Sequence, residues 1–219
     1  MQRPTHSQVL RGKLDLFGRP LDAVLDRFWA SPDVDRLFPR YLVQVHQMIR
    51  ASVPLMETAR RCAAARADDP VCAALVGYLD EHIEEERDHD LWVLEDLEVL
   101  GVPRSEALSR IPAPCVAALV GAQYYWIQHH HPVALLGYIA SLEDRPASAA
   151  FLADLQARTG FPEAAFRTLR KHGQLDPGHR EALDRFFDHL PLLRPHLTLI
   201  GLSLAHTASC LTECIENLL

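Results

Sequence analysis

The sequence lacks the patterns that mark several large classes of protein. It contains no Walker motif, no dinucleotide-binding fingerprint, no Gly-x-Ser-x-Gly nucleophile motif and no run of lysine and arginine. The formal net charge is -7, from 22 basic and 29 acidic residues, so nucleic acid is not an expected partner. No segment alternates between apolar and polar residues as a strand would, and no repeat or long linker interrupts the chain.

Signals for disulfides, secretion and membrane insertion are equally scarce. The five cysteines are odd in number and include no Cys-x-x-Cys pair, which favours buried free thiols over disulfides or zinc. Residues 1–4 lead into no apolar signal core. The segment 197–212 carries no charge except one on His206, but it is shorter than a membrane span and contains several polar side chains. We expect a cytoplasmic protein without a membrane partner.

The composition is that of a globular protein with a substantial core. The chain has 219 residues, of which 48% are hydrophobic and 23% charged, and this length falls short of two comfortable domains. We expect a single domain over residues 1–219, with residues 1–19 loosely ordered. Apolar residues recur at helical spacing through most of the chain. The predicted fold class is therefore all-α, a compact bundle of seven to nine helices.

Prolines indicate where several helices begin, bend or end. Asp69-Pro70 is predicted to start a helix that runs to about Leu100. Pro54 is expected to kink the helix over about 37–65, or to divide it in two. The last helix is predicted over about 193–217. Three later prolines mark further helix starts: Pro146, Pro162 and Pro177.

Residues 82–89 form a charged turn (His-Ile-Glu-Glu-Glu-Arg-Asp-His) inside an otherwise apolar helix. Positions three, four and seven apart share a helix face, so His82 and His89 project together with Glu85 or Glu86. A solvated surface is the ordinary interpretation of so many charges. However, the apolar residues on both sides indicate partial burial, and buried charges require a cation or counter-charges. A metal-binding face is the alternative.

Residues 172–179 carry a second candidate pattern, His-x3-Asp-x2-His. Two imidazoles and a carboxylate suit iron, manganese or zinc, and they are the ligand set of many non-haem iron sites. Pro177 complicates a helical site because it disfavours the α conformation at Asp176 and donates no hydrogen bond. Asp176 is equally compatible with capping a helix that begins at Pro177. Glu143 ends an apolar run, where it could pair with Arg145 or contribute another carboxylate.

Taken together, the segments resemble the haem-oxygenase-like di-iron oxidases and oxygenases. The resemblance rests on residues 82–89, on the run Gly-Tyr-Ile-Ala-Ser-Leu-Glu at 137–143 and on the pattern at 172–179, and it extends over about residues 35–215. That family shares its all-helical fold with haem oxygenase, the thiaminases and pyrroloquinoline quinone synthase. The resemblance therefore implies a haem-oxygenase-like bundle, and it implies metal ligands on three helices: Glu86, His89, Glu143, His172, Asp176 and His179.

The first ligand segment departs from the pattern of some relatives. In those proteins a carboxylate lies two turns before the histidine, where this chain has His82. His82 and Glu85 are therefore further candidate ligands, and Asp96, two turns after His89, is a candidate for supporting the ligands from behind. The tract 129–131 contains three histidines, but adjacent residues on a helix point in different directions. Solvent-facing, helix-end or supporting roles are expected there.

The resemblance implies a metal-dependent oxidoreductase. It would use two Fe(II) ions, with manganese as the alternative metal, and dioxygen as co-substrate. Relatives act on amino acids and fatty acids by N-oxygenation, desaturation or oxidative C–C cleavage, often in natural-product biosynthesis. Two alternatives stay open: a metal-free enzyme of the same fold, either a cofactor-synthesis oxidase or thiaminase-like, and a non-catalytic protein that binds iron or a ligand. The expected partners are a small-molecule substrate and a second copy of the chain in a homodimer.

Overall fold

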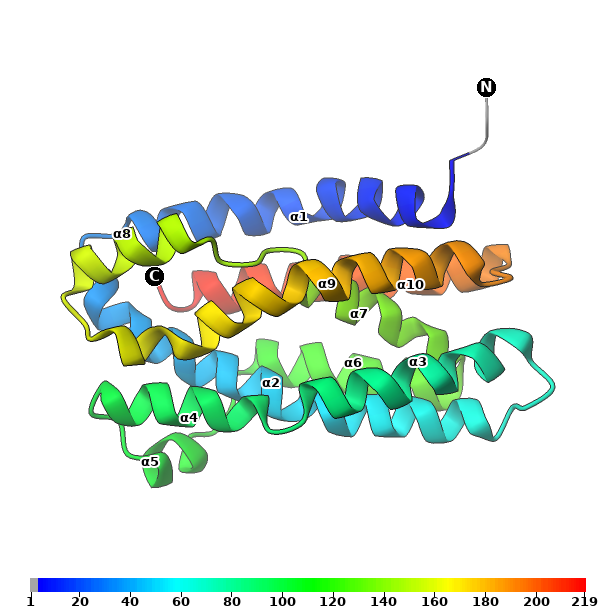
Figure 1. Ribbon diagram of the computed structural model, residues 1–219, viewed down its shortest axis with the longest axis horizontal. Coiled ribbons are helices and arrows are strands. Elements are labelled where there is room, and N and C mark those ends of the chain that lie inside the picture. The colour runs from blue at the N-terminus through cyan, green and yellow to red at the C-terminus, as the bar shows by residue number, and fades with distance from the viewer. Residues whose placement is uncertain (1–3) are drawn as a thin grey trace.

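A computed structural model describes residues 4–219, which contain α-helices and two 3-10 turns and no β-strand (Figure 1). Nine of the α-helices within this range have at least eight residues, and the all-α fold class is confirmed. The elements are α1 (His6–Ala30), α2 (Val34–Ala64), α3 (Pro70–Glu86), α4 (His89–Val99), α5 (Arg104–Ser109), α6 (Pro114–His129), η1 (Pro132–Ala134), α7 (Leu135–Leu142), α8 (Ala149–Thr159), η2 (Glu163–Phe166), α9 (Arg167–His189) and α10 (Arg194–Glu216).

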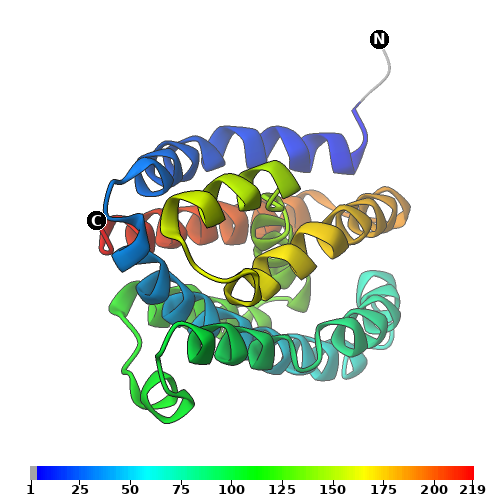
Figure 2. The ribbon, with the colours of Figure 1, turned by 60° about the vertical axis from the view of Figure 1, so that its left-hand side comes forward.

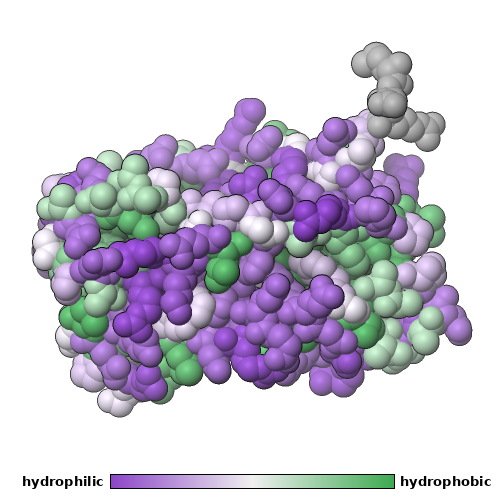
Figure 3. Space-filling model, in the orientation of Figure 1, coloured by the Kyte–Doolittle hydropathy of each residue, from purple (hydrophilic) through white to green (hydrophobic). Residues whose placement is uncertain are grey.

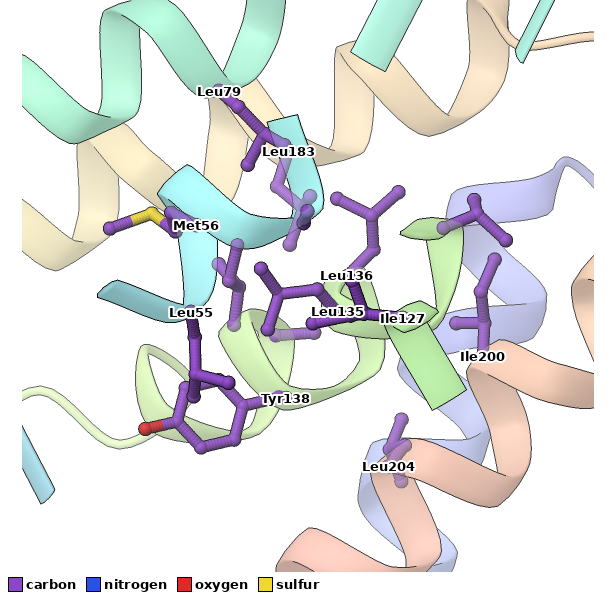
Figure 4. Packing of buried hydrophobic residues seen from close by; sticks show 14 of the residues in the cluster. Leu55, Met56, Leu79, Ile127, Leu135, Leu136, Tyr138, Leu183, Ile200 and Leu204 are labelled. Atoms are coloured by element: carbon purple, nitrogen blue, oxygen red, sulfur yellow. The ribbon is translucent and has the colours of Figure 1, made fainter. Parts of the chain in front are cut away.

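The helices pack in layers around the short helix α7. Helix α1 lies along α10, while α2 packs against α3, α4 and α6 on the other side of the molecule (Figures 1 and 2). The largest apolar cluster includes fully buried side chains from both of these layers and from α7. Figure 4 shows Leu135 and Leu136 of α7 among side chains of the surrounding helices. The core therefore holds α7, and the carboxylate at its end, between the two layers.

One glycine of α7, Gly137, determines how closely this helix approaches α10. A Cβ atom at Gly137 would lie 2.3 Å from the backbone oxygen of Ile200 and 2.8 Å from the backbone nitrogen of Leu204. No larger residue fits there without moving α10. Gly137 therefore permits the close approach of α10 to α7, the helix whose C-cap is Glu143.

The N-terminal segment is more ordered than predicted. Residues 6–19 belong to α1, which begins with a reciprocal capping box on Thr5 and continues through Pro20. Leu10 is only 3% exposed and belongs to the main apolar cluster. The prediction of a loose segment was wrong because burial against α10 and α9 stabilises this helix, and local sequence does not show that burial. Residues 1–3 lie outside the described range.

The helix predicted from Asp69 to about Leu100 is two helices. Helix α3 ends at Glu86, and α4 begins at His89. Between them Asp88 adopts a left-handed conformation with φ 64°, the one positive φ at a residue other than glycine in the described range. A left-handed conformation costs about 1–2 kcal/mol for an L-residue, and Asp tolerates it better than most. No proline or glycine marks this break, so the prediction of one helix was wrong.

At Pro177, in contrast, a predicted helix start is absent. Helix α9 is continuous through Pro177, so the interpretation of Asp176 as the N-cap of a new helix was wrong. The proline cannot donate the hydrogen bond that the carbonyl of Gly173 would normally accept. Gly173 packs against the segment before α8, where an added Cβ atom would lie 2.3 Å from the oxygen of Ala147. Similarly, α2 is not divided at Pro54.

Most of the face shown in Figure 3 is hydrophilic, with hydrophobic residues in small groups. Within the described range, α10 is the helix that is long and apolar enough to cross a membrane by length and composition alone. Half of its most apolar stretch is buried inside the fold, as expected of a core helix.

Candidate metal centre

Donor side chains from α3, α4, α9 and the end of α7 converge at one place in the interior. They form two groups, and within each group one potential ligand atom from every residue lies within 4.8 Å of the others. Glu86 belongs to both groups. The first group is His82, Glu86, Glu143 and His179, and the second is Glu86, His89 and His172.

The two carboxylate oxygens of Glu86 face different groups. Oε2 accepts a hydrogen bond from Nδ1 of His89 at 3.0 Å, while Oε1 lies 3.7 Å from Nδ1 of His179. Burial raises the pKa of Glu86, but the His89 hydrogen bond and nearby histidines outweigh burial and leave the pKa below its ordinary value. A carboxylate placed in this way suits a bridge between two cations.

The first group contains buried atoms without a partner. Oε1 of Glu143 lies 2.9 Å from Nε2 of His82 and 3.5 Å from Nδ1 of His179. Within residues 4–219, Oε2 of Glu143 and Nδ1 of His179 are buried without a hydrogen bond. Buried polar atoms are rarely left in this state, so their arrangement fits a cation bound between them.

Proton affinities in the first group also fit metal binding. The nearby carboxylate of Glu143 raises the pKa of His179 to about 9. Burial lowers the pKa of His82, but the hydrogen bond and charge of Glu143 outweigh burial and leave that pKa raised. For Glu143, burial favours the neutral acid, but the nearby imidazoles of His179 and His82 outweigh burial and lower the pKa. A divalent cation binding to these residues would displace the protons on the two histidines.

In the second group, two successive hydrogen bonds connect His172 through Thr168 to Asp96. Nδ1 of His172 donates to the backbone oxygen of Thr168 at 3.0 Å, which leaves Nε2 with a free lone pair. The backbone nitrogen of Thr168 donates to Oδ2 of Asp96 at 2.8 Å. Asp96 is fully buried, and burial raises its pKa. Asp96 thus links α4 to the start of α9.

Asp176 and Glu85 lie next to the two groups without belonging to them. Asp176 is 5% exposed, and burial together with the charge of Glu143 raises its pKa to about 7. The Glu85 side chain is 57% exposed, and its Oε2 lies 3.5 Å from Nε2 of His179 and 3.6 Å from Nδ1 of His82. Asp176 therefore approaches from the interior and Glu85 from the solvent side. Of the two further candidates, His82 is the one that joins a donor group.

Two aromatic rings that pack on the donors were not predicted. Trp92 stacks on His89 with ring centroids 3.8 Å apart, and Tyr78 stacks on His82 at 5.5 Å. Tyr78 lies four residues before His82 and Trp92 three residues after His89, so helical spacing was the available signal. These rings restrict the orientations of the imidazoles.

The donors open into a cavity of about 850 Å³. His82, Glu86, Glu143, His172 and Asp176 lie in its wall. The other lining residues come mainly from α1, α2, α7, α8 and α10 and are mostly apolar. The arrangement therefore joins a set of metal donors to a space large enough for an organic molecule.

A smaller group, Asp69, Cys72 and His131, also has donor atoms within 4.8 Å of one another. Nδ1 of His131 accepts a hydrogen bond from the backbone nitrogen of Val133 at 3.1 Å, so Nε2 carries the ring proton. Nε2 donates this proton to Asp69 at 3.0 Å, and Asp69 also caps the start of α3. A cation at Nε2 would have to displace that proton. The group is better explained as a link between α3 and η1, the helix-end role expected for this tract.

Comparison with known proteins agrees with the fold. Two solved structures share the fold: a domain of unknown function with a heme oxygenase-like fold from Shewanella denitrificans and a TenA homologue from Pseudomonas syringae pv. tomato. The first is 16% identical with a TM-score of 0.74, covering 96% of this chain and 89% of that one. The second is 14% identical with a TM-score of 0.73, covering 96% and 91%.

At these identities the structures show the fold alone. The search of curated proteins gave no match. The family described as iron-containing redox enzymes, in contrast, matches residues 38–198, which include all the donors described above. The chain therefore belongs to the family of iron-containing redox enzymes and has a haem-oxygenase-like fold.

Proposed function

We propose that this protein is a non-haem di-iron oxidase or oxygenase that uses dioxygen to oxidise a small organic substrate. The observation that carries the proposal is the position of Glu86 between two donor groups, with one carboxylate oxygen toward each. A single-metal site would need no shared carboxylate. Manganese is the alternative metal, since carboxylate and imidazole ligands suit both.

The donor groups divide the proposed ligands between two ions. His82, Glu143 and His179 would hold one ion and His89 and His172 the other, with Glu86 shared. When bound, two ferrous ions would supply the electrons and the open coordination positions that dioxygen chemistry requires. Asp176, whose pKa is raised to about 7, is partly protonated near neutral pH and would lose that proton if a cation bound beside it.

The remaining residues of the site orient the donors and exclude water. The hydrogen bond from His172 to Thr168 fixes which ring nitrogen faces the interior. Trp92 and Tyr78 cover His89 and His82. The apolar walls of the cavity limit solvent access to the place where a substrate would meet the donors.

The thiaminase-like alternative receives less support from this site. Such an enzyme would need a cysteine nucleophile next to an activating base. Among the described residues that line the cavity, none is a cysteine. The TenA homologue shares the fold at 14% identity, which carries no chemistry to this chain.

Anaerobic loading with ferrous iron tests the proposal. We expect about two iron atoms per chain, measured after desalting by elemental analysis, and rapid oxygen consumption when the loaded protein meets air. Iron uptake without oxygen consumption would instead support a protein that only binds iron. Uptake of neither iron nor manganese would exclude the di-iron proposal and favour a metal-free enzyme of this fold.

A further inference from the structure

The cavity is long, and one face of α2 forms much of its wall. A helix rises about 1.5 Å per residue, so residues 41–56 of α2 extend for roughly 22 Å along the cavity. The α2 residues that line it recur at helical spacing: Tyr41, Gln44, Val45, Met48, Ile49, Ser52 and Met56.

The two ends of this wall have different surroundings. At the Ser52 end, its hydroxyl lies 3.4 Å from the hydroxyl of Tyr138. Burial raises the pKa of Tyr138 to about 12, with a contribution from the charge of Glu86, so this end is close to the metal donors. At the other end, Trp29 packs against Tyr41 at 5.0 Å and Phe151 at 5.2 Å between ring centroids. A molecule that fills the cavity would reach from the donors to an aromatic end.

Apart from the donors and Asp176 beside them, the charged side chains that line the cavity are paired or exposed. Arg145 donates to Asp22 at 2.6 Å and to Asp144 at 3.3 Å. Arg158 donates to Asp154 at 3.5 Å and to the backbone oxygen of Ser31 at 3.2 Å. The last acidic residue of the lining, Asp26, is exposed to solvent. Away from the donors and Asp176, a free amino acid, with two opposite charges to bury, would find no unpaired partners.

Gln44 is the polar exception in the apolar part of the wall. Its side-chain oxygen is buried and has no hydrogen-bond partner within residues 4–219. Whichever way the amide is turned, it offers one acceptor and two donors toward the cavity. Gln44 precedes Ser52 by eight residues, which corresponds to roughly 12 Å along the helix axis.

We propose that the cavity binds an unbranched aliphatic molecule whose uncharged hydrogen-bonding group, an alcohol or an amide, is held by Gln44 while its chain extends toward the metal donors. As a substrate class this rests on the proposed function, but binding itself requires no metal. Gln44 is then a residue that determines specificity, because replacing its amide leaves the apolar wall intact and removes the hydrogen bond.

Calorimetric titration of the metal-free protein with straight-chain ligands tests this inference. With primary alcohols from hexanol to decanol, we expect affinity to increase about fourfold for each added methylene. Decanol and decanamide should bind at least about tenfold more tightly than decanoate and decylamine, because the part of the cavity away from the donors and Asp176 has no unpaired charge for either ion. Tighter binding of decanoate would overturn the assignment of an uncharged group, and no binding of any chain would overturn the whole inference.

Matched variants test the role of Gln44. Gln44→Leu should bind decanol about tenfold more weakly and keep the increase with chain length, since only one buried hydrogen bond is lost. Gln44→Met serves as a second variant if the first folds poorly, as judged by circular dichroism. Gln47→Leu is the control, because Gln47 donates to the backbone oxygen of Arg110 and does not line the cavity. Unchanged decanol affinity in both Gln44 variants would contradict the proposal.

Iron loading of the same preparations separates this inference from the proposed function. If the wild type binds decanol but takes up no iron, the binding site stands and the di-iron function fails. If it takes up two iron atoms and binds no straight-chain ligand, the function stands and this substrate class is wrong.

Discussion

The α3–α4 junction and the middle of α9 supply donors to the same centre, but they hold those donors in different ways. At the junction the helix stops between Glu86 and His89, with Asp88 in a left-handed conformation. Helix α9 continues through Pro177, so His172 and His179 lie on one continuous helix. Strain is therefore concentrated at one residue of the junction, whereas α9 has a missing hydrogen bond in its interior. We expect α9 to depend on metal more strongly than the junction does.

The largest expected effect is loss of the donor that both groups share. Glu86→Gln should weaken binding of ferrous iron by at least about 100-fold and lower the stoichiometry at both positions, because one carboxylate faces both groups. Glu84→Gln is the control, since Glu84 is exposed and pairs with Arg87. Anaerobic competition with a chelator measures the affinities. Loss of only one iron atom in Glu86→Gln would contradict a shared role.

The second-largest effect is expected from loss of Asp96, which links α4 to the start of α9. Asp96→Ala should lower the free energy of unfolding by about 1–3 kcal/mol, because the backbone nitrogen of Thr168 at the start of α9 would lose its buried acceptor. Urea unfolding of the metal-free protein measures this change. Asp96→Asn should restore part of the loss, and Glu98→Ala on the exposed side of α4 should have little effect. A loss in Glu98→Ala equal to that in Asp96→Ala would point to a general weakness of α4.

Hydrogen exchange distinguishes the two regions directly. On anaerobic addition of ferrous iron, exchange over residues 172–180 should slow more than over residues 82–90, because metal compensates for the hydrogen bond missing at Pro177. Pro177→Ala should stabilise the metal-free protein by about 1–3 kcal/mol and reduce the difference that iron makes in α9. Equal exchange over residues 172–180 with and without iron would show that metal binding is not coupled to the local folding of α9.

A smaller effect is expected from the strained residue of the junction. Asp88→Val should lower the free energy of unfolding by about 1–2 kcal/mol, because a β-branched side chain fits poorly in a left-handed conformation. Asp88→Gly should stay within about 1 kcal/mol of the wild type, since glycine adopts that conformation freely. Urea unfolding of both variants provides the measurement. Equal losses in the two would show that the aspartate side chain, rather than backbone strain, matters at this position.

The smallest expected effect is a change in how much acidic pH lowers the free energy of unfolding. His46 on α2 is fully buried with neither ring nitrogen partnered in the described range. Burial and the charge of Arg50 lower its pKa below 6.5, with Asp90 opposing and Arg104 assisting. At higher pH the residue is neutral in both the folded and the unfolded chain, so its protonation does not change the free energy of unfolding there. As pH falls below 6.5 the unfolded chain takes up the proton first, and the folded state loses stability.

His46→Leu should therefore reduce the loss of stability between pH 7 and acid in the metal-free protein, as measured by urea unfolding across that range. Hydrogen exchange in α4 should show the same change more clearly than exchange in α9, because α2 packs against α4. A pH dependence that is identical in the variant would assign the acid sensitivity to other groups.

Several features of the fold could be predicted because local chemistry determines them. Asp69 and Pro70 start α3 as predicted, and Gly137 permits the close contact of α7 with α10. The spacing within residues 172–179 indicated one helix face, and α9 carries both histidines, whereas His82 and His89 lie on different helices because of the break at Asp88. Five of the six ligands implied by family resemblance lie in the two donor groups. The break at Asp88 could not be predicted, because no residue there is a helix breaker. Burial of α1 likewise depends on helices far along the chain.

By itself, the sequence determined that the chain is helical, where several of its helices begin and which imidazoles and carboxylates can share a helix face. These properties depend on neighbours within one or two turns. Tertiary structure alone decided that Glu86 faces two groups, that His82 joins one of them while Asp176 stands beside them, and that a long apolar cavity reaches the donors. Each of these depends on the packing of helices distant in sequence, because the position of a side chain in space is set by the helices around it.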